Sequence, residues 1–515
     1  MSTRREFIKT TTFSGAAWSL AGLGPAAGSI LSENAPAPPR RPNIVFILSD
    51  DQGAWTLGNP EIITPNLDRL AATGVRCPNF FCASPVCSPA RASILTGAIP
   101  SVHGVHDWLR AGNLDMEQFA SLTAARPGHY QDEHAAVDYL QNFTTYTDLL
   151  ADCGYTCALS GKWHLGDSIR PRRGFHHWFT IARGGCDYFH ADTVSDGQVK
   201  FETRYVTDLI TDRALAMLDD LRAGAAPFYL GVHYTAPHSP WDAANHQPEH
   251  LDLYRDCPFA TVPDLPPHPW QIDTAPRGHG PAREELLRGY FAAITAMDAG
   301  IGKIIRKLAE RPDPTIIIFT SDNGMNMGHH GIWGKGNGTF PQNMYDTSVK
   351  VPFIISYPGH LRPGVCENLL SHYDIFPTLL DYLGLGDWPG RSRLVGRSFA
   401  RVVNGQAPGA DEFVVVFDEY GPVRMIRNAQ WKYIRRYPHG PNELYHVARD
   451  PEETRNLIAA REHQPIAEQL NHRLLEFYTR HADPRVDGTR EHVTGYGQLR
   501  RAGLYAEGKP VYHEG

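Results

Sequence analysis

Two short pairs of oxygen-bearing side chains, Asp50-Asp51 and Asp322-Asn323, have the composition of a metal site. Three carboxylates and one amide oxygen are hard ligands that suit Ca²⁺ or Mg²⁺ rather than zinc, since no histidine or thiolate set accompanies them. Either pair alone is also typical of the turn that follows a strand. Because both pairs follow apolar runs in a chain that also carries Cys87, we interpret them as one metal site.

A second candidate is the segment Cys87-Ser88-Pro89-Ala90-Arg91, which continues into Ala92-Ser93-Ile94-Leu95-Thr96-Gly97. A cysteine four residues before an arginine, with a proline between them, is neither a metal-binding nor a disulfide pattern. On its own the segment is equally compatible with the buried start of a helix of small residues that carries an inert cysteine.

Further cationic side chains occur downstream, at Lys162, His164, His238 and Lys335. Fixed cations stabilise the negative charge that develops when an ester of a strong acid is cleaved, and a histidine or lysine can protonate the leaving oxygen. Taken singly, each lysine is also compatible with a solvated surface side chain and each histidine with a structural one.

The elements that must position these residues are apolar runs that end in polar groups. The runs are 43–48, 155–159, 227–232 and 315–320. Continuous apolar strands are those buried on both faces, as in a parallel sheet between helices, and ligands bind beyond the carboxyl ends of such strands. Helical patterns at 65–71, 204–221 and 284–308 alternate with the runs. We therefore predict an α/β fold with a large, mostly parallel central sheet flanked by helices.

The pattern changes after about residue 405. Short strand-like runs at 412–417, 423–426, 431–435 and 443–445 predict a small antiparallel sheet, followed by a helix at about 462–481 and a polar tail to residue 515. The predicted domains are residues 1–40 as signal and linker, 41–405 as the catalytic α/β domain and 406–515 as the C-terminal subdomain. The irregular polar stretch 111–141 is a candidate lid or substrate-binding insertion.

The segment Thr3-Arg4-Arg5-Glu6-Phe7-Ile8-Lys9 is similar to a twin-arginine export signal, and a weakly apolar run follows it. It predicts export by the twin-arginine translocase to the periplasm or the medium; the alternative is a basic arm on a cytosolic protein. The net charge of −7 argues against a nucleic-acid partner, and no long apolar stretch predicts a membrane span. The eight cysteines do not form a dense disulfide scaffold.

The ordered motifs resemble the type I sulfatase family of the alkaline phosphatase-like superfamily over about residues 41–460. The signature C-x-P-S/A-R-x-x-x-L-T-G matches at Cys87, with Ala90 where many relatives have serine. The other motifs are Ser49-Asp50-Asp51-Gln52-Gly53, Gly161-Lys162-Trp163-His164-Leu165-Gly166, Ala236-Pro237-His238 and Thr320-Ser321-Asp322-Asn323-Gly324. The resemblance implies the alkaline phosphatase-like fold with a small C-terminal sheet domain and one bound Ca²⁺, with Mg²⁺ as the alternative.

The resemblance also implies that a formylglycine-generating or radical maturase converts Cys87 to formylglycine (3-oxoalanine). The hydrated aldehyde offers two hydroxyls on one carbon, one to attack sulfur and one to expel sulfate. The implied metal ligands are Asp50, Asp51, the modified Cys87, Asp322 and Asn323. Arg91 and His164 would steady the hydrate, with His164 assisting elimination. The sulfate would be held by Lys162, His238 and Lys335, of which His238 or Lys335 would protonate the leaving group.

Three functions are therefore considered. The leading one is an exported sulfatase acting on a sulfated carbohydrate; the second is a phosphodiesterase or phosphonate monoester hydrolase of the same superfamily; the third is a glycan-binding relative without catalysis. Six further residues are hypothesised to line the pocket, namely His103, His106, Asp107, Trp108, His329 and His330.

Overall fold

A large sheet positions the candidate residues. The computed structural model describes residues 41–514 except 126–127, 129, 408–411 and 419–421, so the twin-arginine-like segment lies outside the described residues. Within them, ten strands form a sheet in the order β13-β2-β12-β9-β1-β8-β4-β5-β6-β7. Their bounds are β1 (Asn43–Ser49), β2 (Val75–Arg76), β4 (Thr156–Gly161), β5 (Phe175–Ile181), β6 (Ala191–Ser195), β7 (Gln198–Glu202), β8 (Phe228–His233), β9 (Thr315–Ser321), β12 (Phe353–Ser356) and β13 (Gly364–Val365).

The centre of this sheet is parallel and its flanks are mixed. Strands β9, β1, β8, β4 and β5 run parallel to one another, whereas β12, β6 and β7 pair antiparallel with their inner neighbours. The four apolar runs predicted as strands are β1, β4, β8 and β9, which are adjacent in the sheet. The predicted α/β architecture is confirmed, with antiparallel pairs added on both flanks of the parallel centre.

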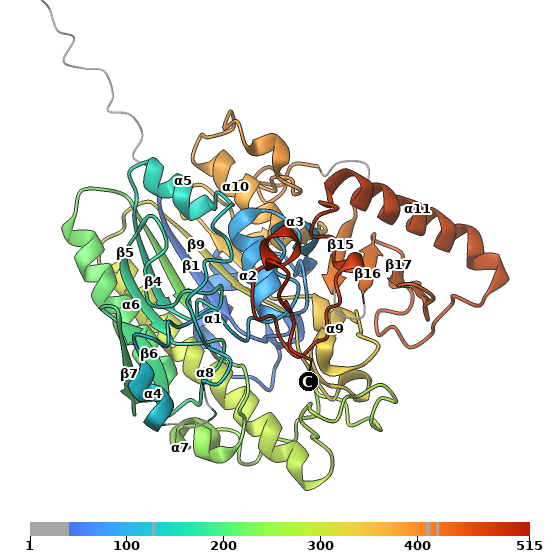
Figure 1. The fold of residues 1–515 in the computed structure, drawn as a ribbon, viewed down its shortest axis with the longest axis horizontal. Coiled ribbons are helices and arrows are strands. Elements are labelled where there is room, and N and C mark those ends of the chain that lie inside the picture. Colours follow the sequence, from blue (N-terminus) through green and yellow to red (C-terminus); the bar gives the residue numbers. More distant parts are fainter. Residues whose placement is uncertain (1–40, 126–127, 129, 408–411, 419–421, 515) are drawn as a thin grey trace, which may run out of the picture. The chain divides into compact units, whose positions relative to one another are not determined.

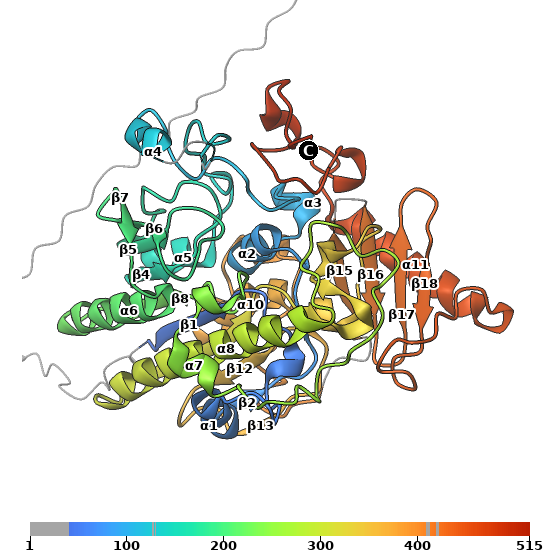
Figure 2. The ribbon, with the colours of Figure 1, turned by 90° about the horizontal axis from the view of Figure 1, so that it is seen from below.

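Helices cover both faces of the sheet (Figures 1 and 2). Along β1, Ile44 and Phe46 belong to a core shared with α2 (Cys87–Thr96), α5 (Tyr146–Asp152) and α10 (Ile375–Tyr382). Val45 and Ile47 belong to a core shared with α1 (Pro65–Thr73), α6 (Val206–Ala223) and α8 (Pro281–Ala309). Alternating side chains of one strand thus enter two apolar layers, which explains the continuous apolar runs. The helices are α1 (Pro65–Thr73), α2 (Cys87–Thr96), α3 (Pro100–His103), α4 (Ala120–Ala125), α5 (Tyr146–Asp152), α6 (Val206–Ala223), α7 (Pro248–Asp252), α8 (Pro281–Ala309), α9 (Asp346–Val349), α10 (Ile375–Tyr382) and α11 (Gln464–His481).

The predicted small sheet is also confirmed. Strands β15 (Val414–Asp418), β16 (Val423–Arg427), β17 (Lys432–Arg436) and β18 (Glu443–Tyr445) form an antiparallel meander, and α11 packs on it. Two minor pairs are β3 (Phe80–Phe81) with β14 (Leu370–Ser371), and β10 (Asn326–Met327) with β11 (Trp333–Gly334). Residues 41–515 cluster as one compact unit, so the boundary after residue 405 stays a prediction.

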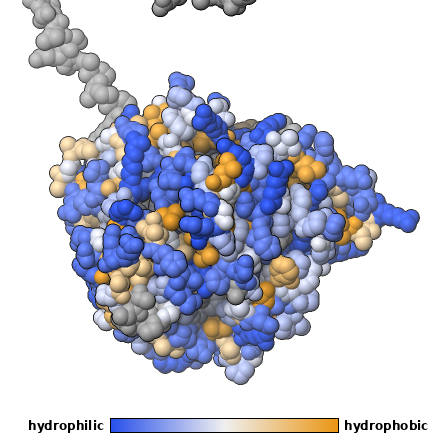
Figure 3. All heavy atoms as spheres, viewed as in Figure 1, coloured by the Kyte–Doolittle hydropathy of each residue, from blue (hydrophilic) through white to orange (hydrophobic). Residues whose placement is uncertain are grey.

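The segment after α11 returns to the large sheet domain. It lies beside α3 in both ribbon views, and the Asp483 amide donates to the Ser101 carbonyl oxygen at 2.8 Å (Figures 1 and 2). The face seen in Figure 3 is mainly hydrophilic, with apolar residues scattered over it. Among the described helices, none is both long and apolar enough to cross a membrane.

Candidate active site

The pairs Asp50-Asp51 and Asp322-Asn323 meet at the carboxyl ends of β1 and β9. These strands pair in parallel with Ser49 opposite Ser321, so the residues that follow them leave the sheet side by side. The Asp51 amide donates to Asp322 Oδ1 at 3.2 Å, and Asn323 Nδ2 donates to Asp51 Oδ1 at 2.8 Å. Asp51 has a φ of 60°, an uncommon conformation for a residue with a side chain and one that concentrates at functional sites.

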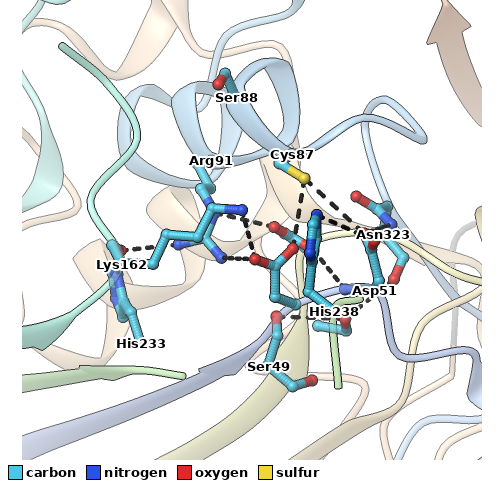
Figure 4. Close-up of polar contacts among 12 residues, drawn as sticks. Ser49, Asp51, Cys87, Ser88, Arg91, Lys162, His233, His238 and Asn323 are labelled. Atoms are coloured by element: carbon cyan, nitrogen blue, oxygen red, sulfur yellow. Dashed lines mark hydrogen bonds and ion pairs between the residues drawn. The ribbon is translucent and has the colours of Figure 1, made fainter. Parts of the chain in front are cut away.

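Cys87 is the first residue of α2, whose residues are all buried. Its Sγ lies 3.4 Å from Asp50 Oδ1 and 3.8 Å from Asp51 Oδ1 (Figure 4). Lys335 Nζ lies 2.8 Å from the same sulfur and 2.5 Å from Asp51 Oδ1. Burial, reinforced by the charge of Asp50, raises the pKa of the Cys87 thiol far above its ordinary value. The unmodified side chain is therefore a protonated thiol, not a thiolate.

Arg91 and Lys162 are buried cations that lie to one side of the cysteine (Figure 4). Arg91 is one helical turn beyond Cys87, on the same side of α2. Its Nε donates to Asp322 Oδ2 at 2.9 Å and its Nη1 to the Lys162 carbonyl oxygen at 2.9 Å. Lys162 Nζ forms an ion pair with Asp50 Oδ2. Burial alone would lower the pKa of Lys162, but the charge of Asp50 outweighs it and raises the pKa above its ordinary value.

The acidic residues fit a divalent cation on their own chemistry. Donor atoms of Asp50, Asp51, Cys87 and His238 lie within 4.8 Å of one another. Asn323 Oδ1 is buried without a hydrogen-bond partner, as expected of an atom that is left to bind a metal. Both carboxylate oxygens of Asp322, in contrast, already have partners: Oδ1 accepts from the Asp51 amide and Oδ2 accepts from Arg91 Nε. Its part in binding the metal stays a prediction.

His164 follows β4 in a left-handed conformation, with a φ of 55°. Its Nε2 lies 3.1 Å from the Leu109 carbonyl oxygen, and its buried Nδ1 has no partner. A carbonyl oxygen accepts only, so Nε2 carries the proton and Nδ1 presents a lone pair. Burial and the charges of Lys162 and Arg91 hold the pKa of His164 well below its ordinary value. The ring is therefore neutral and able to accept a proton at Nδ1.

His238 follows β8 and is the most exposed of the candidate histidines at the site, with 27% of its side chain accessible. Its Nδ1 lies 2.7 Å from the Ser239 carbonyl oxygen, and its Nε2 lies 3.6 Å from Asp51 Oδ2. The hydrogen bond to the carbonyl places a proton on Nδ1, which leaves Nε2 at the pocket.

A cavity of about 520 Å³ opens above these groups, and Cys87, Lys162, His164, His238 and Lys335 line it. Of the six hypothesised lining residues, Trp108 lines the cavity. The other five do not, which corrects the hypothesis. His103 contacts Ser93, Asp107 accepts from the Gly497 amide, and His106 is buried. His329 packs at a tilt against Trp55, and His330 stacks on Tyr345. Nearness to the motifs in sequence did not imply nearness to the cavity.

Sequence reasoning missed most of the cavity wall. Part of the wall comes from the irregular stretch, through Tyr130, Asp132 and Glu133, which agrees with a substrate-binding insertion. Arg110, Arg183, Gly184 and Asn337 also line it. Gly184 is needed for space, because a Cβ there would lie 2.1 Å from His164 Nε2. Nothing in the sequence around Gly184 indicates this contact.

The sheet with its parallel centre, the charged groups at the carboxyl ends of its strands and the cysteine that begins a buried helix agree with the sulfatase family of the alkaline phosphatase-like superfamily, to which the comparisons assign the chain. A family model described as Sulfatase matches residues 42–385, about two thirds of the chain. The chain belongs to the sulfatase family and is a sulfuric ester hydrolase. A second model, described as N-sulphoglucosamine sulphohydrolase, C-terminal, matches residues 328–480.

Several curated relatives match over most of their length. The N-acetylglucosamine-6-O-sulfatase of Bacteroides thetaiotaomicron is 26% identical, with 87% of this chain and 88% of the relative covered. The ulvan-active sulfatase of Formosa agariphila is 28% identical, with 85% and 81% covered. Among solved structures, that of a protein in complex with its own substrate, D-glucosamine-2-N,6-O-disulfate, matches with a TM-score of 0.72 at 24% identity. The match covers 88% of this chain and 100% of that one, which supports the fold.

Proposed function

We propose that this sulfatase removes sulfate from a sulfated carbohydrate, using formylglycine made from Cys87 by a maturase, and Ca²⁺ bound at the acidic residues. The observation that carries the proposal is the place of Cys87. Its side chain lies at the floor of the cavity, against two carboxylates and the Lys335 ammonium. A sulfur that served only packing would have apolar neighbours instead.

The carbohydrate assignment is supported by relatives and by the cavity. Two relatives are named for N-acetylglucosamine 6-O-sulfate and ulvan activity. The cavity wall offers hydrogen-bonding and charged groups, including Arg110, Asp132 and Glu133, and one aromatic face at Trp108. Such a combination of polar groups with an aromatic surface suits a polyhydroxylated ring that bears charge.

When bound, the metal supplies positive charge to a sulfate oxygen, and the hydrated aldehyde supplies one hydroxyl as nucleophile and a second for sulfate release. Asp50, Asp51 and Asn323 would hold the metal, with Asp322 completing the set. Three buried carboxylates face three cations, the buried Arg91 and Lys162 and the partly buried Lys335. A divalent ion therefore leaves the site with net positive charge, which attracts an anionic ester.

The remaining residues would divide charge stabilisation and proton transfer between them. Lys162 and Lys335 counter the charge that develops on the sulfate oxygens. In the imidazolium form, with a proton on both ring nitrogens, His238 would donate the Nε2 proton to the leaving oxygen and keep its Nδ1 bond to Ser239; Lys335 is the alternative donor. His164 would accept a proton at Nδ1 during sulfate release, because its neutral ring donates Nε2–H to Leu109.

The alternative is hydrolysis of a phosphodiester or phosphonate monoester. It is motivated by fold neighbours such as the phosphonate monoester hydrolase from Silicibacter pomeroyi, with a TM-score of 0.64 at 20% identity over 86% of this chain and 96% of that one. Because sulfate and phosphonate esters differ mainly in charge, relative rates on the two aryl esters separate these functions.

The test combines a mass measurement with those rates. Peptide mass spectrometry of the Cys87 segment, in protein from its native host, should show the aldehyde. Purified enzyme should then cleave p-nitrophenyl sulfate faster than p-nitrophenyl phosphonate esters, and Cys87→Ala should release no sulfate. An unmodified thiol in active protein would refute the formylglycine proposal, and faster phosphonate cleavage would favour the alternative.

We further propose export to the periplasm or the medium by the twin-arginine translocase. The proposal is motivated by the paired Arg4 and Arg5 before Phe7. Replacing both arginines by lysine should retain the protein in the cytoplasm; unchanged export of that variant would refute the route.

A further inference from the structure

The segment 495–513, beyond the residues matched by either family model, contacts the wall of the cavity. Gln498 pairs in parallel with Leu109 and antiparallel with Tyr512 through single β-bridges. Its amide donates to the Trp108 carbonyl oxygen at 2.8 Å, and its carbonyl oxygen accepts from the Arg110 amide at 3.0 Å. The backbone of Gln498 is therefore bonded on both sides of Leu109.

The side chain of Gln498 adds a second set of bonds and is fully buried. Its Oε1 accepts from the amides of His106 at 2.9 Å and Asp107 at 3.4 Å. Its Nε2 donates to the carbonyl oxygens of Gly104 at 3.0 Å and Arg500 at 2.9 Å. One amide group thus satisfies four backbone groups, and three of them belong to residues 104–107.

Residues 104–110, which Gln498 holds in this way, are bonded through Leu109 to His164 and to the start of α2. The Leu109 carbonyl oxygen is the partner that fixes the His164 tautomer. The Leu109 amide donates to Ser88 Oγ at 3.1 Å, next to Cys87 in α2. The two flanking side chains enter the cavity wall and are also bonded to the tail: Trp108 Nε1 donates to the Gly495 carbonyl oxygen at 3.4 Å, and Arg110 Nη1 to that of Tyr496 at 3.3 Å.

We infer that Gln498 is a positioning residue for the reaction: it fixes residues 106–110 so that Leu109 orients His164 and so that Trp108 and Arg110 shape the substrate wall. The inference relies on the proposed role of His164. A displaced Leu109 carbonyl releases Nε2, and the ring is then free to turn its lone pair away from the reacting atoms. A misplacement of about 1 Å at such a group costs roughly 100-fold in rate.

The test compares Gln498→Met, which keeps the side-chain length without hydrogen bonds, with two controls. Gln406→Ala changes an exposed glutamine, and Leu504→Ala changes a tail residue that is 72% exposed. For Gln498→Met we expect kcat on p-nitrophenyl sulfate to fall by about tenfold or more, since His164 acts on every substrate. On N-acetylglucosamine 6-sulfate, KM should rise as well, because the sugar also meets Trp108 and Arg110. Both controls should retain the wild-type kcat.

Hydrogen exchange supplies a second reading that a general loss of stability would not mimic. In Gln498→Met, amides of residues 104–110 should exchange faster, while those of β1 and β9 keep their protection. If exchange is unchanged, or if it accelerates while kcat on both substrates stays within about twofold, the inference is wrong. If wild-type enzyme releases no sulfate from either substrate, the proposed function fails separately.

Should Gln498→Met not fold, the wild type decides the question. Amides of residues 106–110 and 495–500 should then open with the same protection factor, because one set of bonds holds both. Unequal protection of the two segments would overturn the inference.

Discussion

Replacing Gly184 by alanine should displace His164 and disable the reaction. The added Cβ would lie 2.1 Å from Nε2, 2.3 Å from Cε1 and 2.6 Å from Cδ2 of the ring. Non-bonded atoms prefer a separation of about 3.5 Å, so the ring must move by more than about 1 Å. A shift of that size costs about 100-fold in kcat, or about 2.7 kcal/mol of transition-state stabilisation. Initial rates of p-nitrophenyl sulfate hydrolysis measure it.

The neighbouring glycine is the matched control. A Cβ on Gly185 would have His238 Cε1 as its nearest contact, at 3.7 Å, which is an ordinary van der Waals distance. Gly185→Ala should therefore keep kcat within about threefold of wild type. In a His164→Ala background, Gly184→Ala should have no further effect, because the two changes act through one ring. A Gly184→Ala enzyme with wild-type kcat, or a fully additive double variant, would refute the reasoning.

Three further outcomes are expected. Chelation should abolish activity and lower Tm, because it removes the roughly 3–4 kcal/mol of stability that a metal contributes at about 100 to 1,000 times its Kd. Ca²⁺ should restore both, and a Tm that does not respond to chelator would contradict the metal site. Burial lowers the pKa of His246 to about 4, so the folded state binds fewer protons than the unfolded state between about pH 6.5 and 4. The stability that His246 contributes is therefore present above pH 6.5 and is lost as the pH falls to 4, and His246→Gln should flatten urea midpoints measured across that window. Lys432→Met removes the ammonium that the partly buried Asp346 and the buried Glu453 share, which should cost about 3–5 kcal/mol in urea unfolding; a smaller loss would mean that this ion cluster does not anchor the C-terminal sheet.

The sheet and the residues at its carboxyl ends could be predicted because local patterns fix both. A continuous apolar run specifies a strand buried on two faces, and parallel pairing brings strand ends together. Asp51 and Asn323 are therefore within hydrogen-bond distance although they are 272 positions apart. The same reasoning placed Lys162 and His164 after β4 and His238 after β8.

The parts that escaped prediction depend on contacts without a local pattern. Gly184 is needed because of a ring that follows a different strand, and Gln498 lies in a segment whose polar composition resembles any surface tail. His106 and Asp107 follow the cysteine signature closely, yet they bond to the tail: their backbone amides donate to Gln498, and the Asp107 carboxylate accepts from the Gly497 amide. Proximity in sequence is a poor guide here because Trp108 and Arg110 line the cavity, whereas the residues just before them bond to the tail.

The bonds between Gln498 and the segment after α3 also set an order of events during synthesis. The amide of His106 is 392 positions from the side chain that accepts from it. At about 5–20 residues per second, a ribosome needs roughly 20 to 80 s to add that many residues, so these bonds cannot close until then. Throughout this interval the start of α2 is less constrained than in the folded protein, where its residues are all buried. The maturase that we propose for Cys87 would therefore have a period of tens of seconds in which to act before the tail is synthesised.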